Sequence, residues 1–181
     1  MELGLQRGTA KVLPHQPEWR AKAAETIGML KALLGDTAVD IQHVGSTAIP
    51  AIHAKPIIDL AVGLRDLRDV QPYIRPLEQA GVCFRGEDVP GQMLFVMGDL
   101  EKEFRTHHVH MVQWNSAAWN NYLNFRDYLN AFPEKAAAYD ACKQDLAARF
   151  PNDRRRYTAG KREIIDRLLE EARRWRASDP S

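Results

Sequence analysis

The sequence predicts an α+β fold, in which a mixed β-sheet with flanking helices precedes a helical C-terminal segment. Short runs of apolar and β-branched residues recur between positions 39 and 112, separated by turns that contain glycine or proline. From position 116 onward, helix-forming residues dominate, and the apolar ones recur every three or four positions. We expect a single domain at 1–181, with the sheet-containing core at 1–114 and the C-terminal helices packed on it at 115–177.

The first half of the chain shows alternating strand and helix signals. The expected elements are a short strand, a helix, two strands and a second helix, at residues 11–13, 18–34, 39–44, 56–64 and 67–80. Gly35 ends the apolar periodicity of the first helix, because glycine commonly follows a helix C-terminus. Pro72 and Pro76 lie inside the second helical pattern, so they are expected to shorten or break it.

The second half begins with three further strand signals and ends in helices. The expected strands lie at 82–85, 93–97 and 104–112, and the expected helices at 116–132, 133–150 and 151–175. Ser116 is a suitable N-cap for the first of these helices, and Pro133 is a suitable first residue for the second. We expect the tail after Ala177 to be loose.

The composition argues against several classes of partner. The net charge is +1, so the chain has no overall field that would attract nucleic acid. No apolar run reaches the length of a membrane span, and the N-terminus lacks the layout of a signal peptide. Cys83 and Cys142 lack metal-ligand spacing and are too few for a disulfide framework, which favours a reducing cytoplasmic setting.

The stretch from Val39 to Leu64 carries the strongest chemical signal. Its first β-rich run ends in Gly45-Ser46-Thr47, where glycine permits close approach of the backbone to a ligand and the hydroxyl residues can begin a helix. Exposed amides and a hydroxyl at such a turn suit a phosphate group. The next strand is apolar except for Asp59, which needs a cation, a metal ion or several hydrogen bonds when buried. Each motif alone also fits an ordinary turn or cap.

Two histidines on a later strand are candidates for the same site. Successive side chains of a strand alternate between its faces, so Thr106, His108 and His110 share one face. His107 points to the other face. Two imidazoles placed two residues apart can hold a metal ion or a phosphate group. The alternative is a hydrogen-bonded polar strip at a sheet edge.

Two segments of the chain, H-V-G-S-T-A-I-P at 43–50 and A-K-P-I-I-D-L-A-V at 54–62, resemble the signature of the GrpB family, also called UPF0157. The resemblance continues at three later places, H-V-H-M-V at 108–112, F-R-D-Y-L at 125–129, and Tyr157 with Lys161. This family is related to the nucleotidyltransferase superfamily and also occurs fused to bacterial dephospho-CoA kinases. The resemblance therefore implies a nucleotidyltransferase-like sheet and covers nearly the whole chain.

The superfamily pattern also shows where this chain departs from it. In that pattern a Gly-Ser turn holds the nucleotide phosphates, two carboxylates one residue apart on a strand bind divalent metal, and a later strand supplies a third. Gly45 and Ser46 match the turn, and Asp59 matches the first carboxylate. The position of the second is Ala61, which has no ligand atom, and the later strand offers histidines in place of a carboxylate.

The resemblance implies a set of site residues and a cofactor. Catalytic and metal-binding roles fall to Asp59, His108 and His110, with Mg²⁺ or Mn²⁺ as the ion. The implied contacts to a nucleotide or other phosphorylated small molecule are Gly45, Ser46, Thr47, His43, Lys55, Arg126 and Lys161. For two of these cations the alternative is a salt bridge, Lys55 with Asp59 or Arg126 with Asp127. His15, His53 and His107 are interpreted as ordinary surface or core histidines.

Three functional hypotheses follow from the departure at Ala61. In the first, one metal ion supports transfer of a nucleotidyl or phosphoryl group. In the second, the site binds a nucleotide or phosphate without catalysis, because a single carboxylate compensates poorly for two metal ions. In the third, the chain is a protein-interaction or stabilising module, a role consistent with fusion to a kinase.

Overall fold

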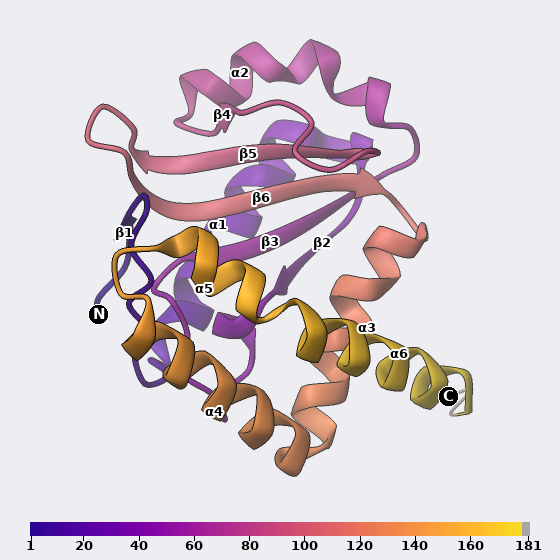
Figure 1. The fold of residues 1–181 in the computed structure, drawn as a ribbon. Coiled ribbons are helices and arrows are strands. Elements are labelled where there is room, and N and C mark those ends of the chain that lie inside the picture. Colours follow the sequence, from indigo (N-terminus) through magenta and orange to yellow (C-terminus); the bar gives the residue numbers. More distant parts are fainter. Residues whose placement is uncertain (179–181) are drawn as a thin grey trace.

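The computed structural model describes residues 1–178, and they form one mixed six-stranded sheet with helices on both faces (Figure 1). The strands lie in the order β2-β3-β6-β5-β4, and β1 also pairs with β6. Their bounds are Leu5–Gln6 for β1, Ala38–Val44 for β2, Ile58–Leu64 for β3, Cys83–Phe84 for β4, Gln92–Asp99 for β5 and Phe104–Gln113 for β6. The predicted α+β class is confirmed.

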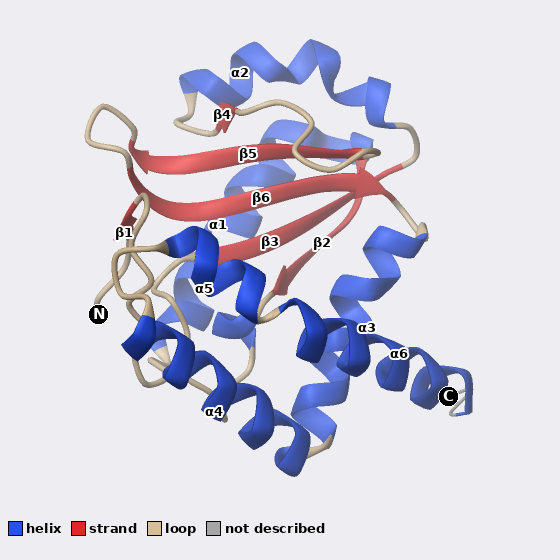
Figure 2. Cartoon of the chain, in the orientation of Figure 1, coloured by secondary structure: helices blue, strands red, loops and turns tan. Residues whose placement is uncertain are grey.

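The helices form two groups on either side of the sheet (Figure 2). The first group comprises α1 (Glu18–Leu34), which lies behind the sheet in the figure, and α2 (Ile74–Gln79), which lies beside β4. The C-terminal group covers the front and comprises α3 (Ala117–Ala131), α4 (Pro133–Arg149), α5 (Arg154–Gly160) and α6 (Arg162–Ser178). Within residues 1–178, no helix combines the length and the apolar character needed to cross a membrane.

Several element boundaries differ from the sequence-based expectation. The predicted strand at 11–13 is reduced to a single bridge between Leu13 and Ala54, and the first strand is β1. The predicted helix at 67–80 begins as a 3₁₀ helix over Leu67–Tyr73, and only α2 is α-helical. Pro72 and Pro76 remove backbone donors there, which explains the short α-helix. The tail prediction concerns mainly residues 179–181, which lie outside the described chain.

The C-terminal helices follow their predicted capping signals closely. Ser116 is the N-cap of α3 and accepts a hydrogen bond from the Trp119 amide at 3.3 Å, and Pro133 occupies the first turn of α4. The single helix expected at 151–175 is instead two helices. The first ends at Gly160, and the second begins after Lys161. The side chain of Asp153 caps the first of them.

The pairing of β3 with β6 positions the chemistry of the molecule. These strands are parallel, while β2 is antiparallel to β3 and β5 is antiparallel to β6. The register places Asp59 beside His108 and Ala61 beside His110. Directly paired residues share one face of a sheet. The carboxylate and both imidazoles therefore project from the front face, toward the C-terminal helices.

Both faces of the central strands are covered by apolar packing. Behind the sheet, Leu60 and Val62 are fully buried in a core that also includes Leu30 and Leu34 of α1. In front, a small cluster surrounds Ala61, and a separate core joins the C-terminal helices to the segment after β2. This double burial explains why β3 is apolar at nearly every position.

Shortening one buried side chain of the central strand β3 tests the hydrophobic core behind the sheet. Leu60→Ala removes a fully buried side chain, so we expect the free energy of unfolding to fall by about 2–5 kcal/mol. Urea denaturation followed by circular dichroism would measure the change. Val89→Ala, at a side chain that is 51% exposed, is the control and should alter stability by less than about 0.5 kcal/mol. Equal effects of the two variants would contradict the assigned core.

Candidate functional site

A cavity of about 670 Å³ lies between the front face of the sheet and the C-terminal helices. This volume is in the range of pockets that bind small molecules. The turn after β2, strands β3 and β6, and helices α3, α5 and α6 all contribute to its lining. Seven of the residues expected at a site from the sequence line it, namely Gly45, Ser46, Lys55, Asp59, His108, His110 and Lys161.

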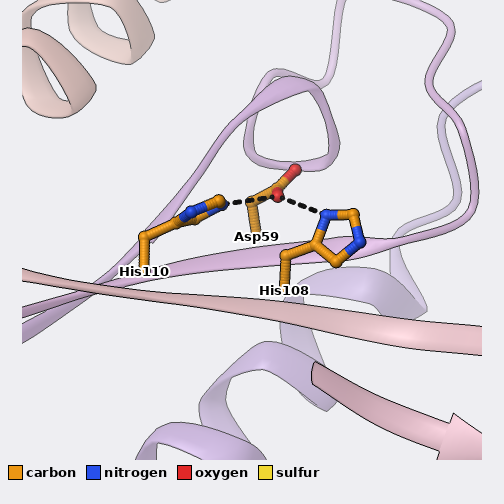
Figure 3. A group of neighbouring side chains, drawn as sticks. All are labelled: Asp59, His108 and His110. Atoms are coloured by element: carbon orange, nitrogen blue, oxygen red, sulfur yellow. Dashed lines mark hydrogen bonds and ion pairs between the residues drawn. The ribbon is translucent and has the colours of Figure 1, made fainter. Parts of the chain in front are cut away.

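Asp59 lies between two imidazoles at the floor of this cavity (Figure 3). Its Oδ1 is 3.1 Å from Nε2 of His110 and 3.4 Å from Nδ1 of His108. One donor atom from each of the three residues lies within 4.8 Å of the others. A carboxylate with two imidazoles at this spacing is a donor set suited to one divalent cation.

The protonation of this group is set by its surroundings. Burial alone would raise the pKa of Asp59, but hydrogen bonds from His108 and His110 outweigh burial and hold that pKa well below its ordinary value. Burial lowers the pKa of His108, although the nearby Asp59 opposes that change. At neutral pH the group is therefore a carboxylate with a neutral His108. Within residues 1–178, the buried Nε2 atom of His108 has no hydrogen-bond partner.

Gly45 brings the turn into close contact with this carboxylate. Its φ of 71° is disfavoured for residues that have a Cβ, and a Cβ placed there would lie 2.6 Å from Oδ2 of Asp59. The next residues form a three-residue 3₁₀ helix, Ser46–Ala48, so the hydroxyl residues begin a short helical segment as expected. The turn therefore places the Ser46 backbone and side chain at the cavity beside Asp59.

Three basic side chains line the cavity together with that one carboxylate: Lys55, Arg154 and Lys161. Within residues 1–178 none of them forms an ion pair, so the salt bridge considered between Lys55 and Asp59 is not formed. The ammonium groups of Lys55 and Lys161 lie 5.4 and 4.6 Å from the centre of the Tyr157 ring. Tyr157 thus holds both lysines through cation–π contacts.

Burial and mutual repulsion make the charged forms of Lys55 and Lys161 unfavourable. Burial lowers the pKa of Lys55 well below its usual range, and the neighbouring Lys161 and Arg154 lower it further. Burial also lowers the pKa of Lys161 to about 8, with Asp59 opposing the change and Arg154 adding to it. An anion bound among these groups would relieve both the mutual repulsion and the loss of hydration.

A hydrogen-bonded chain supports His110 from the side of β5. The Tyr122 hydroxyl donates to Oε1 of Gln92 at 2.8 Å, and Nε2 of Gln92 lies 3.3 Å from Nδ1 of His110. With Gln92 donating, the imidazole proton is on Nε2, where it is donated to Asp59. The Tyr122 ring also stacks on the imidazole at 5.2 Å. Gln92 and Tyr122 therefore orient a candidate metal ligand.

The structure also explains the absence of a second carboxylate on β3. Ala61 is fully buried and packs with Val44, Val112 and Trp119. An aspartate side chain at this position would be placed among apolar groups. His110, paired with Ala61 on the neighbouring strand, supplies the polar atom on this part of the sheet face.

Three expected contacts lie elsewhere. His43, Thr47 and Arg126 line a different cavity, at the β2 edge of the sheet beside α1. For His43 the reason is the alternation of β2: Val44 pairs with Asp59 and shares its face, so the preceding His43 points away. Arg126 forms the alternative salt bridge, with its Nε 2.8 Å from Oδ1 of Asp127.

Helix α5 and the residue after it contribute four side chains to the front cavity, and only Lys161 among them is an expected ligand contact. Arg154, Tyr157, Thr158 and Lys161 all line the cavity and are spaced as i, i+3, i+4 and i+7. This spacing places them on one helical face, whereas Arg155 and Arg156 are exposed. This helical spacing is the sequence feature that could have indicated the lining residues of α5. No sequence feature indicates Gln92, because an isolated glutamine on a strand predicts no site.

Two of the remaining histidines, His107 and His53, have structural roles. His107 is buried, as expected from strand alternation, and its Nε2 lies 3.1 Å from the Thr26 hydroxyl. The His53 backbone amide donates to Oδ1 of Asp140 at 2.6 Å, and Nδ1 of its ring lies 2.9 Å from Oδ2 of the same carboxylate. These contacts fix the segment before β3 to α4.

Comparison with known proteins shows the family to which this chain belongs. A family described as GrpB protein matches residues 9–171 of the chain. The chain belongs to the GrpB family. The glutamate-rich protein GrpB of Alkalihalophilus pseudofirmus is 36% identical over 151 residues, which cover 82% of this chain and 87% of that protein. The UPF0157 protein YqkA of Bacillus subtilis is 35% identical over 77% of this chain, but the match spans only 40% of that protein.

Solved structures agree with the family assignment. The crystal structure of conserved protein GrpB from Enterococcus faecalis has a TM-score of 0.79 and 30% identity to this GrpB-family chain, covering 89% of this chain and 98% of that one. A structure of a cytoplasmic RNA terminal U-transferase has a TM-score of 0.47 and 12% identity over 73% of this chain and 44% of that one. So distant a similarity leaves function to be argued from the site itself.

The close approach at Gly45 is testable by adding a single carbon. Gly45→Ala introduces both a disfavoured φ and a clash with Asp59, so we expect unfolding to become easier by at least about 1–2 kcal/mol. Thermal and urea denaturation would measure it. Gly28→Ala is the matched control, because an added Cβ there meets nothing within 4 Å and helix formation gains about 0.5–1 kcal/mol. A Gly45→Ala protein as stable as wild type would contradict the geometry.

Proposed function

We propose that this GrpB-family protein binds a nucleotide or another phosphorylated small molecule in the front cavity, together with one divalent cation. The observation that carries the proposal is the charge of the cavity lining. It combines one carboxylate flanked by imidazoles with three basic side chains that have no ion-pair partner within residues 1–178. Buried basic groups of this kind are costly unless an anion accompanies them.

The phosphate-binding role falls to the basic groups and the turn. Lys55, Arg154 and Lys161 would neutralise phosphate oxygens, and Ser46 would donate a hydrogen bond from its hydroxyl. Tyr157 keeps the two lysines beside each other without competing for the anion, since an aromatic face offers no negative charge to be displaced.

The cation role falls to Asp59, His108 and His110, whose donor atoms fit a single ion. Two imidazoles favour Mn²⁺ or Zn²⁺ over Mg²⁺, because magnesium prefers oxygen ligands. When bound, such a cation would act as a Lewis acid toward a phosphoryl oxygen. Gln92 would support the site by fixing the orientation of the His110 ring.

Transfer of a nucleotidyl or phosphoryl group is the catalytic activity that we propose for this site. The lining residues would hold the phosphates, exclude water behind the C-terminal helices and balance charge on the transferred group. The second candidate is binding without catalysis. It is favoured by the apolar packing around Ala61, which leaves no second carboxylate on β3.

Calorimetry with ATP, in the presence and absence of Mn²⁺, tests the proposal. We expect wild-type protein to bind ATP with Mn²⁺, and Asp59→Asn to lower Mn²⁺ affinity by more than the roughly 10- to 100-fold loss typical of outer-shell partners. Asp36→Asn, at an exposed residue far from the cavity lining, should have no effect. Release of pyrophosphate would mark nucleotidyl transfer and release of ADP would mark phosphoryl transfer, with water or an added hydroxyl compound as the acceptor. Binding without release would favour the second candidate. Failure to bind ATP or any phosphate compound, with or without the cation, would refute both.

The shifted pKa of Lys161 predicts a pH dependence. Its pKa of about 8 lies below the ordinary 10.5, so the folded protein loses this charge at lower pH than the unfolded chain does. Because only the charged lysine attracts phosphate, ATP affinity should fall by about tenfold between pH 7.5 and 9. Lys161→Arg keeps its charge across this range and should reduce the drop. Titrations in which the two proteins show the same pH dependence would exclude Lys161 as its source.

A further inference from the structure

The second cavity, at the β2 edge of the sheet beside α1, has the chemistry of an anion site of its own. It encloses about 500 Å³ between α1, the end of β2 and α3. Its polar lining comprises His15, Arg20, Gln42, His43, Thr47, Arg126 and Asn130. No carboxylate lines it among the residues that the structure describes. The two guanidinium groups therefore give it a positive potential.

Arg126 is held in place by its neighbours. Its Nε pairs with Asp127, and its Nη1 donates to Oε1 of Gln42 at 2.9 Å and to the His43 carbonyl at 3.0 Å. Asp127 is shared with Arg176, so these three charged groups sum to +1. A guanidinium fixed on one side and charged overall is preorganised to receive an oxyanion on its remaining N–H groups.

The other polar groups add directional contacts without adding negative charge. Burial lowers the pKa of His43 to about 4 and also lowers that of His15, so both rings are neutral at pH 7. His43 is fixed by the Thr47 hydroxyl, 2.8 Å from its Nε2. Nδ1 of His15 is buried and has no hydrogen-bond partner in the described chain. Arg20 is exposed and forms no ion pair within residues 1–178.

We propose that this second cavity binds an oxyanion, a carboxylate or phosphate group of a small molecule, between Arg20 and Arg126. Its apolar wall, formed by Ala23, Ala24, Ile27, Ile41 and Pro50, accommodates the carbon skeleton of the ligand. The site is separate from the front cavity, because the two cavities share no lining residue. It does not depend on the function proposed for Asp59.

Side-chain NMR of the full chain tests this site without interference from the front cavity. Inorganic phosphate and sodium acetate are titrated separately to 20 mM at pH 7.5 and constant ionic strength, while the His15 and His43 ring signals are followed. We expect saturable shifts of both rings with at least one anion. Stronger binding of phosphate or of acetate distinguishes the two oxyanions. Lys161→Met should leave these shifts unchanged.

Charge-removing variants provide the decisive comparison. Arg20→Gln is at an exposed position, so it should fold normally and weaken anion binding by about tenfold or more. Arg155→Gln makes the same change at an exposed residue that lines neither cavity, and should alter the dissociation constant less than twofold. Absence of saturable shifts, unchanged affinity in Arg20→Gln, or equal loss in both variants would each overturn the proposal.

Discussion

The parallel pairing of β3 with β6 is the constraint on which the rest of the molecule depends. It joins strands that are more than forty positions apart in the chain and sets Asp59 beside His108. The C-terminal helices then close over that face, and burial makes an isolated carboxylate dependent on its imidazole neighbours. A register shifted by one residue would move His108 and His110 to the other face, away from Asp59.

Local patterns in the sequence anticipated much of this arrangement. Strand alternation correctly separated His108 and His110 from His107, and Gly45 marked a turn that approaches another group closely. Non-local relations were harder to predict. Nothing in the order of residues shows that β3 pairs with β6, or that α5 is folded back over the turn after β2. Those placements depend on packing between distant segments, which no local period encodes.

The dependence on packing between distant segments also explains why His43 and Thr47 line a different cavity from the one expected. His43 and Thr47 sit within one short motif with Gly45 and Ser46, and proximity in sequence suggested a common role. His43, however, lies in a strand, where adjacent side chains face opposite directions, and only the pairing partner of Val44 shows which direction leads to Asp59. The run of three arginines at 154–156 is most simply a solvated face, with phosphate contact as the alternative, and only the placement of α5 shows that Arg154 lines the cavity while Arg155 and Arg156 do not.

The two-sided use of β2 also restricts how this chain can change in length. A single residue inserted into the seven of Ala38–Val44 would rotate everything after it by half a turn, exchanging the groups presented at front and back. With the insertion before Gln42, the histidine would then enter the apolar cluster around Ala61, and the glutamine would replace it beside Arg126. Insertions are therefore compatible with the architecture only outside this strand, in connections such as the loop between β4 and β5.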